Sequence, residues 1–124
     1  MNQTQAVAEQ FTKFYYDTFD RNRTELASLY RDPSMLTFEG VQTQGVNSIV
    51  EKLVSLPFQK VAHRISTVDA QPSNPNNQSI VVTVTGQLLI DDETNPQMFT
   101  QTFNLIADGG SFWVYNDIFR LNYA

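Results

Sequence analysis

The hydrophobic pattern of this 124-residue chain changes character within one stretch, Val54–Ile65. Before it, apolar residues recur at helical spacing, and after it they alternate as in β-strands. Pro57 cannot continue a helix and biases Leu56 away from the α region. Helical signals first and strand signals afterwards predict an α+β fold, in which helices cover one face of an antiparallel sheet.

Three helices are expected before the main strands. Ala6–Phe19 carries aromatic side chains on one face, and packing against a sheet is their simplest role. Asn22 followed by Glu25 resembles a capping box, which predicts a short helix over Arg23–Leu29. The third helix is expected over Asn47–Val54.

Five segments are expected to be strands: Met35–Phe38, Phe58–Asp69, Ser79–Ile90, Gln97–Ala107 and Ser111–Tyr123. The last strand is apolar on both faces. Simple alternation there places Trp113, Tyr115, Phe119 and Leu121 on one face and Phe112, Val114 and Ile118 on the other. Helices can cover only one of these faces, so a second copy of the chain is the simplest cover for the other. A half-exposed sheet with scattered apolar groups is the alternative.

Composition excludes several classes of function. The formal net charge of −5 disfavours nucleic acid as a partner, because phosphate binding needs clustered Lys and Arg. There is no cysteine, and so no disulfide framework or thiolate metal site. No apolar run approaches the ~20 residues that span a bilayer, and no signal peptide is expected. We expect one domain over residues 1–124 without membrane association.

Catalytic signatures are sparse. A single histidine, His63, cannot build a His-pair metal site. It could act as a base oriented by Glu39 or Asp117, or it could be a packing residue with a hydrogen bond. Asp117 stands among bulky apolar residues and could be a buried acceptor for backbone donors.

Two acidic elements stand beside apolar residues. Phe38 precedes Glu39, and Leu88–Ile90 runs into Asp91 and the acids that follow it. If both border a cleft between the helices and the sheet, an apolar socket with a carboxylate rim results. Such a socket suits an aromatic side chain with a neighbouring Lys or Arg from a partner. The alternative for the acidic loop is a solvated turn.

Five segments closely resemble the nuclear transport factor 2 family: Leu36–Gly40, Ile49–Leu53, Ser55–Val61, Gly86–Leu88 and Asn116–Leu121. Phe14–Tyr16 with Phe19, Asp20 and Arg23 also fits, and the likeness is collinear over nearly the whole chain. The resemblance implies a cone-shaped α+β fold of three helices on a strongly bent antiparallel sheet, with a homodimer formed through the sheet. It also implies a non-enzymatic carrier, without cofactor or metal. Such a carrier binds Ran-GDP, the GDP form of the small GTPase Ran, and the Phe-x-Phe-Gly repeats of nucleoporins. The cytoplasm, nucleus and nuclear pore complex are its expected locations.

The resemblance also implies site residues. An aromatic side chain of Ran would enter an apolar cavity whose rim is formed by Glu39, Asp91 and Glu93. The matching cavity positions are Phe38, Phe58, Val61, Leu88, Ile90 and Phe119. His63, Thr83 and Ile118 match positions near the dimer interface. Thr4 stands where the family commonly has an aromatic residue that helps bind nucleoporin repeats, so either other residues build that pocket or repeat binding is weaker.

Two other classes of function stay open at this point. Enzymes of the same cone fold, such as isomerases and dehydratases, use polar groups deep in the cavity. His63, Asp117 and a Tyr hydroxyl converging there would favour this class. A third possibility is an interaction module that pairs with another protein's copy of the fold.

Overall fold

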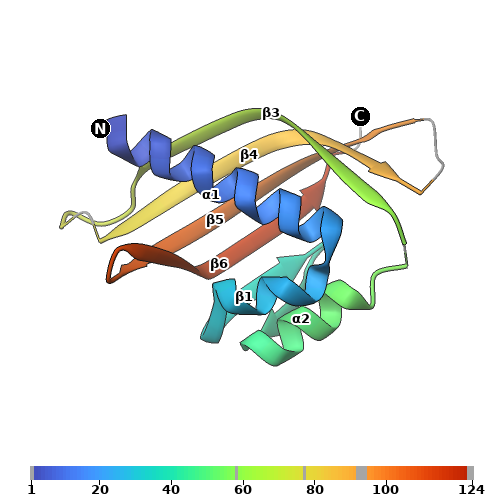
Figure 1. Ribbon diagram of the computed structural model, residues 1–124, viewed down its shortest axis with the longest axis horizontal. Coiled ribbons are helices and arrows are strands. Elements are labelled where there is room, and N and C mark those ends of the chain that lie inside the picture. Colours follow the sequence, from blue (N-terminus) through green and yellow to red (C-terminus); the bar gives the residue numbers. More distant parts are fainter. Residues whose placement is uncertain (1, 58, 77, 92–94, 123–124) are drawn as a thin grey trace.

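The fold is described from a computed structural model, which covers residues 2–57, 59–76, 78–91 and 95–122. It has three helices and a curved six-stranded sheet (Figure 1). The helices are α1 (Asn2–Arg21), the 3-10 helix η1 (Arg23–Leu29) and α2 (Val46–Val54). The strands are β1 (Tyr30–Phe38), β2 (Val41–Gln44), β3 (Val61–Pro72), β4 (Ser79–Ile90), β5 (Gln97–Asp108) and β6 (Ser111–Leu121). The α+β class and the three expected helices are therefore confirmed.

The sheet is mixed, so the expectation of a purely antiparallel sheet is wrong. Its strand order is β2-β1-β6-β5-β4-β3, and β1 runs parallel to β6 while the other pairs are antiparallel. A parallel pair needs a long connection between its strands. Here α2 and the strands from β2 to β5 supply that connection, so β1 can pair with β6 on the side away from β5.

A β-bulge in β6 changes the expected face of its side chains. Asn104 pairs with Asn116 and Leu105 pairs with Val114, so Tyr115 is the extra residue on its strand. The inner, helix-facing side of β6 consequently carries Phe112 and Val114 and then Asp117 and Phe119. The outer side carries Trp113, Tyr115 and Ile118. Strict alternation could not predict this exchange.

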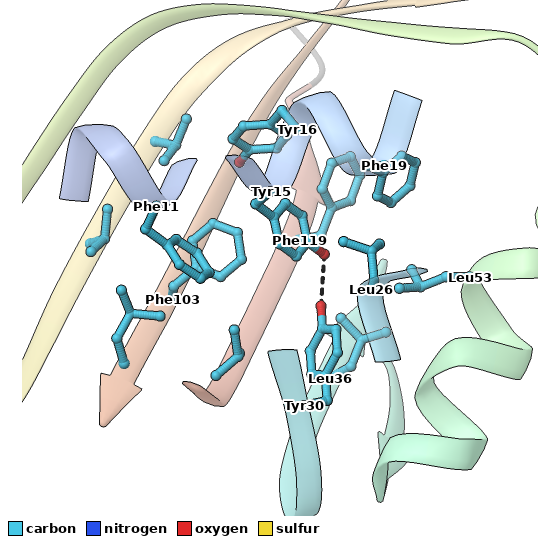
Figure 2. Packing of buried hydrophobic residues seen from close by; sticks show 14 of the residues in the cluster. Phe11, Tyr15, Tyr16, Phe19, Leu26, Tyr30, Leu36, Leu53, Phe103 and Phe119 are labelled. Atoms are coloured by element: carbon cyan, nitrogen blue, oxygen red, sulfur yellow. Dashed lines mark hydrogen bonds between the residues drawn. The ribbon is translucent and has the colours of Figure 1, made fainter. Parts of the chain in front are cut away.

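Helix α1 lies diagonally across the inner face of the sheet (Figure 1). Its aromatic face forms the core with strand side chains (Figure 2). The Tyr15 ring lies 4.8 Å from the Phe103 ring, and Phe11 lies 5.3 Å from the same ring, both edge to face. These contacts confirm the packing role predicted for the aromatic residues of the first helix.

Local residues explain where the two shorter helices begin. Asn22 caps η1 by accepting a hydrogen bond from the backbone N–H of Thr24 at 3.2 Å. Helix α2 follows Gly45, whose φ of 93° suits glycine, and buries Ile49 and Leu53. In the described parts of the chain, no helix is long and apolar enough to span a membrane.

Candidate functional site

One end of the sheet gathers the residues expected at the binding site. Phe38 near the end of β1 pairs with Phe119 near the end of β6. On the far side of the sheet, Val61 at the start of β3 pairs with Ile90 at the end of β4. The carboxyl ends of β1, β4 and β6 therefore lie with the amino ends of β3 and β5 at one edge, which we call the mouth.

Two of the expected rim acids stand in the turns at this mouth. Glu39 and Asp91 both have a φ of 51°, in the left-handed region that tight turns use. Because β1 and β4 are three strand spacings apart in the sheet, the two acids lie roughly 14 Å apart along it. Glu93, the third expected rim acid, lies outside the described residues.

Both rim carboxylates also hold the backbone in place. Oε1 of Glu39 accepts a hydrogen bond from the backbone N–H of Leu121 at 2.5 Å. Oδ1 of Asp91 accepts from the N–H groups of Gln59 and Lys60 at 3.0 and 2.9 Å. Since a carboxylate has about four acceptor positions, each acid can still accept bonds from a partner.

Behind the mouth lies a small internal cavity of ≈ 10 Å³. It is lined by Tyr15, Phe19, Leu36, Phe38, Leu53, His63, Leu88, Gln101, Asp117 and Phe119. A space of this size holds about one water molecule, whereas a cavity that takes a benzene ring measures about 150 Å³. The side chains of the protein itself therefore fill the cone almost completely.

Stacked aromatic rings close the cavity toward the mouth. The Phe38 and Phe119 rings stack with centroids 4.6 Å apart, and Phe99 continues the stack at 5.4 Å from Phe119. Nζ of Lys52 on α2 lies 5.9 Å from the centroid of the Phe38 ring. Phe38 is half-buried and Phe119 is buried, so Phe38 is the more accessible of the two stacked rings.

The structure brings together only some of the expected cavity residues. Phe38, Leu88 and Phe119 line the cavity. Val61 and Ile90 pack against the core but do not line it. Phe58 lies outside the described residues.

The floor of the cavity is a buried polar network around Asp117. Its carboxylate accepts hydrogen bonds from the Tyr30 hydroxyl at 2.6 Å, the Tyr15 hydroxyl at 3.2 Å and Nε2 of Gln101 at 2.7 Å. The Tyr16 hydroxyl donates to Oε1 of Gln101 at 2.8 Å. Figure 2 shows the Tyr15 and Tyr30 hydroxyls, 2.7 Å apart, meeting between α1 and β1. Asp117 is thus a buried acceptor, but its donors are side chains and not the backbone groups that the sequence led us to expect.

Burial controls the protonation of this network. It raises the pKa of Asp117 from an ordinary value of 3.8 to about 6, although the three donors oppose the rise. Burial also raises the pKa values of Tyr15 and Tyr30 well above 10, so both hydroxyls keep their protons and remain donors. The network is internally satisfied, which leaves little for a substrate to bind.

His63 faces the interior of the cone. Its side chain is only 2% exposed, and Nδ1 lies 2.6 Å from Oδ1 of Asp20. The other carboxylate oxygen of Asp20 accepts from the His63 backbone N–H at 2.9 Å, and the imidazole packs against Tyr16 and Phe19. Its side chain therefore does not share a face with Thr83 and Ile118, with which it was grouped at the dimer interface. The packing interpretation of His63 agrees with these contacts.

Thr83 and Ile118 do lie together on the outer face of the sheet. Both pair with Thr102, so they stand in one row across β4, β5 and β6. Ile118 is 51% exposed, and Tyr115 nearby is also exposed. Nothing in the described chain covers this face, because the helices pack on the other one.

A second hollow, of ≈ 280 Å³, lies at the N-terminal end of α1. Its lining includes Thr4 and Val7 of α1 and, from the sheet, Pro72, Ile80 and Phe112. Thr4, the position at which the resemblance implied an aromatic residue, supplies no ring to this hollow. Among its described lining residues the aromatic one is Phe112 on β6.

Sequence reasoning missed most of the cavity wall. Tyr15 and Phe19 were assigned only to the core, and Gln101 was not identified at all. One signal could have found Gln101, because a glutamine at an inward position of a strand between Phe99 and Phe103 needs a buried partner. Over the described residues, no group of three acidic, His or Cys side chains is placed to hold a metal ion.

The fold and site define a class of protein. Its members have a curved sheet with helices on the inner face, an interior filled by aromatic side chains, and carboxylates at the mouth. The family model for the nuclear transport factor 2 (NTF2) domain matches residues 7–121. The chain therefore belongs to the nuclear transport factor 2 family, which places it in nuclear transport. It is 66% identical over 119 residues to nuclear transport factor 2 of Candida glabrata, covering 96% of this chain and 94% of the relative. Its structure is similar to that of nuclear transport factor 2 from Cryptosporidium parvum, with a TM-score of 0.89 and 48% identity over 97% of this chain and 95% of that one.

One of the distant structural neighbours has the name of an enzyme. A putative scytalone dehydratase from Novosphingobium aromaticivorans has a TM-score of 0.79 but only 13% identity, over 95% of this chain and 83% of that one. Such a likeness shows the fold alone.

Proposed function

We propose that this protein is a non-enzymatic carrier that binds the small GTPase Ran in its GDP form and the Phe-x-Phe-Gly repeats of nucleoporins. It would act as a homodimer and move between cytoplasm and nucleus through the nuclear pore complex. The observation that carries the proposal is the mouth, where Glu39 directly follows Phe38 of the Phe38–Phe119 stack and Asp91 follows β4, two strands from Phe119.

The mouth suits a partner with one aromatic ring between basic side chains. A ring can stack on half-buried Phe38, while the carboxylates of Glu39 and Asp91 at the same mouth accept bonds from Lys or Arg. Opposite charges at the rim also speed association and orient the partner. The overall charge of −5 adds to this attraction for a basic surface.

Full insertion of a ring requires a rearrangement. The cavity of ≈ 10 Å³ is far smaller than a phenyl group, so Phe38 or Phe119 has to rotate when the ring enters. Side-chain rotations of this kind are common at interfaces whose backbone moves little.

Nucleoporin repeats are assigned to the hollow beside Thr4. Its volume of ≈ 280 Å³ can accept a phenyl ring, and Val7, Ile80 and Phe112 give it an apolar wall. Phe112 offers a ring for aromatic contact, which the helix position does not supply here.

The homodimer is assigned to the outer face of the sheet. Exposed Ile118 and Tyr115 and half-buried Trp113 and Thr83 form a mostly apolar surface across β4 and β6. Asp69, which pairs with Thr83, and Arg31, which lies over Trp113, place charges at its edges. Such a surface is typical of an interface between copies of one chain.

The arrangement of polar groups disfavours an enzyme. Asp117 and His63 border the same small cavity, but Asp117 is bonded to Tyr15, Tyr30 and Gln101, and His63 to Asp20. The space left in this conformation holds about one water molecule, so the satisfied hydrogen bonds of Asp117 and His63, and not the cavity size alone, are what disfavour an enzyme.

Substitutions at Glu39 test the Ran-binding proposal. Glu39→Lys should weaken the affinity for Ran-GDP by at least about a hundredfold, because it replaces an acceptor of basic side chains with a like charge. Glu39→Gln keeps an oxygen that can accept from Leu121 and removes only the charge, so its affinity should fall between those of Glu39→Lys and the unaltered chain. Calorimetric titration with Ran-GDP gives the three affinities.

The stability of the variants provides the control. Loss of one hydrogen bond should lower the free energy of unfolding of Glu39→Lys by about 1 kcal/mol, too little to unfold the protein. Equal affinity of all three proteins for Ran-GDP would remove Glu39 from the site.

A further inference from the structure

We propose that the groove between α1 and β3 is a second binding site for a Phe-x-Phe-Gly segment, on the opposite flank of α1 from the hollow beside Thr4. This inference rests on the proposed function, because it assumes that nucleoporin repeats are partners of this protein. It would give each copy of the chain two places to bind a multivalent repeat region.

The groove has the size and lining for aromatic side chains. Its volume is ≈ 290 Å³, on the order of two benzene-sized groups. Tyr16 and Thr12 of α1 form one wall, and Ile65 and Val68 of β3 form the other. His63 separates this groove from the internal cavity, since it lines both.

β3 is an edge strand, and within the described residues α1 bonds to its free backbone groups at two points. Oδ2 of Asp20 accepts from the His63 N–H at 2.9 Å, and Nε2 of Gln5 donates to the Val68 carbonyl at 2.7 Å. These bonds show that inward-facing residues of β3 direct their backbone groups away from β4. By the same alternation, Ile65 between them directs its N–H and C=O to the free edge, and in the described chain no α1 side chain is bonded to it.

The spacing along β3 matches the repeat. A β-bulge lies between Ile65 and Thr67, so Ile65 and Val68 are successive inward-facing residues, roughly 7 Å apart. The two Phe residues of an extended Phe-x-Phe segment lie on one face with the same separation. If the second Phe pairs its N–H and C=O with Ile65 in an antiparallel arrangement, the first Phe lies against Val68 and both rings point into the groove, in the manner of a strand added to a sheet edge.

The charges along the groove suit an uncharged segment. Nζ of Lys13 pairs with Asp17 at 3.2 Å, and Glu9 accepts a hydrogen bond from Gln5 at 3.0 Å. The charged side chains along the groove are thus largely paired within α1, so they leave little net electrostatic potential to disfavour a neutral peptide.

The test is a titration of the ¹⁵N-labelled full chain with a Phe-Ser-Phe-Gly peptide, followed by backbone amide shifts. The inference predicts two separate clusters of shifts, one around Thr4 and Phe112 and one around Tyr16 and Ile65. The Ile65 amide should move downfield, because it gains an acceptor. An Ala-Ser-Ala-Gly peptide should move neither cluster.

Two controls separate the groove from the hollow. A peptide N-methylated at both Phe nitrogens keeps its rings but cannot donate to the Ile65 carbonyl, so it should lose only the second cluster. Ile65→Thr keeps a β-branched residue and reduces the apolar wall, so it should weaken binding at the second cluster at least fivefold and leave the first unchanged. Its melting temperature confirms that it folds.

The outcomes are distinct. Shifts confined to the cluster around Thr4 overturn the groove site and leave the proposed function intact. Shifts in neither cluster overturn the groove site and the nucleoporin part of the proposed function together. A second cluster that survives N-methylation overturns the edge pairing on which the inference depends.

Discussion

The two faces of the sheet differ in what covers them. The inner face is closed by the chain itself, since aromatic rings and the Asp117 network leave only ≈ 10 Å³ unfilled. The outer face carries Ile118 at 51% exposure and Tyr115 at 38%, with no helix over them. The inner face thus stabilises the single chain, whereas the outer face is the one that we propose for association.

The largest expected effect is on that association. Ile118→Asp places a charge in the middle of the proposed interface and should weaken dimer formation by about 4 kcal/mol, on the order of a thousandfold. Light scattering over a dilution series measures the mass of the particle in solution.

Val54→Asp is the matched control, because Val54 is similarly exposed, at 48%, but ends α2 on the helix side. It should leave the mass unchanged. If Ile118→Asp stays a dimer, or if the unaltered chain is a monomer at all concentrations, the outer face loses its proposed role.

The next effect belongs to the inner face and depends on pH. Because the pKa of Asp117 is raised to about 6 in the folded state, the folded chain holds a proton there that the unfolded chain releases near 3.8. Stability from this group is therefore fully present below pH 3.8 and is lost as pH rises to 6, by about 3 kcal/mol. Asp117→Asn should remove this fall between pH 4 and 6.

Denaturant titrations at several pH values measure the effect. The difference in the free energy of unfolding between the two proteins is the quantity to plot, because other carboxyl groups titrate in both. If this difference in the free energy of unfolding stays constant from pH 4 to 7, the raised pKa of the buried Asp117 carboxyl group is contradicted.

The smallest expected effects are on the free energy of unfolding. They concern two neighbouring residues of β4, Gly86 and Thr85, whose Cβ positions lie on opposite faces of the sheet. A Cβ at Gly86 would lie 2.5 Å from the Arg64 carbonyl oxygen and 3.1 Å from the Phe99 ring. Gly86→Ala should therefore lower the free energy of unfolding by about 2 kcal/mol. Thr85→Ala, which loses an exposed hydroxyl contact with Thr67, should cost about 0.5 kcal/mol in the monomer. Chemical denaturation of both variants in the Ile118→Asp background measures the two costs, and equal costs would contradict the contrast between the faces.

Much of the fold was predictable from local patterns. The helical periodicity of Ala6–Phe19 and the cap at Asn22 depend on neighbouring residues, and both are found in the structure. The parallel pairing of β1 with β6 and the bulge at Tyr115 depend on contacts between distant segments. Since β6 is apolar on both faces, no polar residue marks where the alternation shifts.

The site was predictable to a lesser degree. Glu39 and Asp91 were identified from their position after apolar strands, and the register brings both to the mouth. The filling of the cavity could not be predicted, because it depends on how Tyr15, Phe119 and Gln101 pack from three separate elements. The inward position of His63 depends on Asp20, which lies 43 residues earlier in the chain.

Whether this protein is a Ran-GDP carrier can be decided by the retention of Ran on the immobilised chain, with Ran loaded with GDP or with GTP at equal concentration. The account predicts strong retention of Ran-GDP, little retention of Ran-GTP, and loss of the GDP signal for Glu39→Lys. Equal retention of both nucleotide forms, or retention of neither, would contradict it.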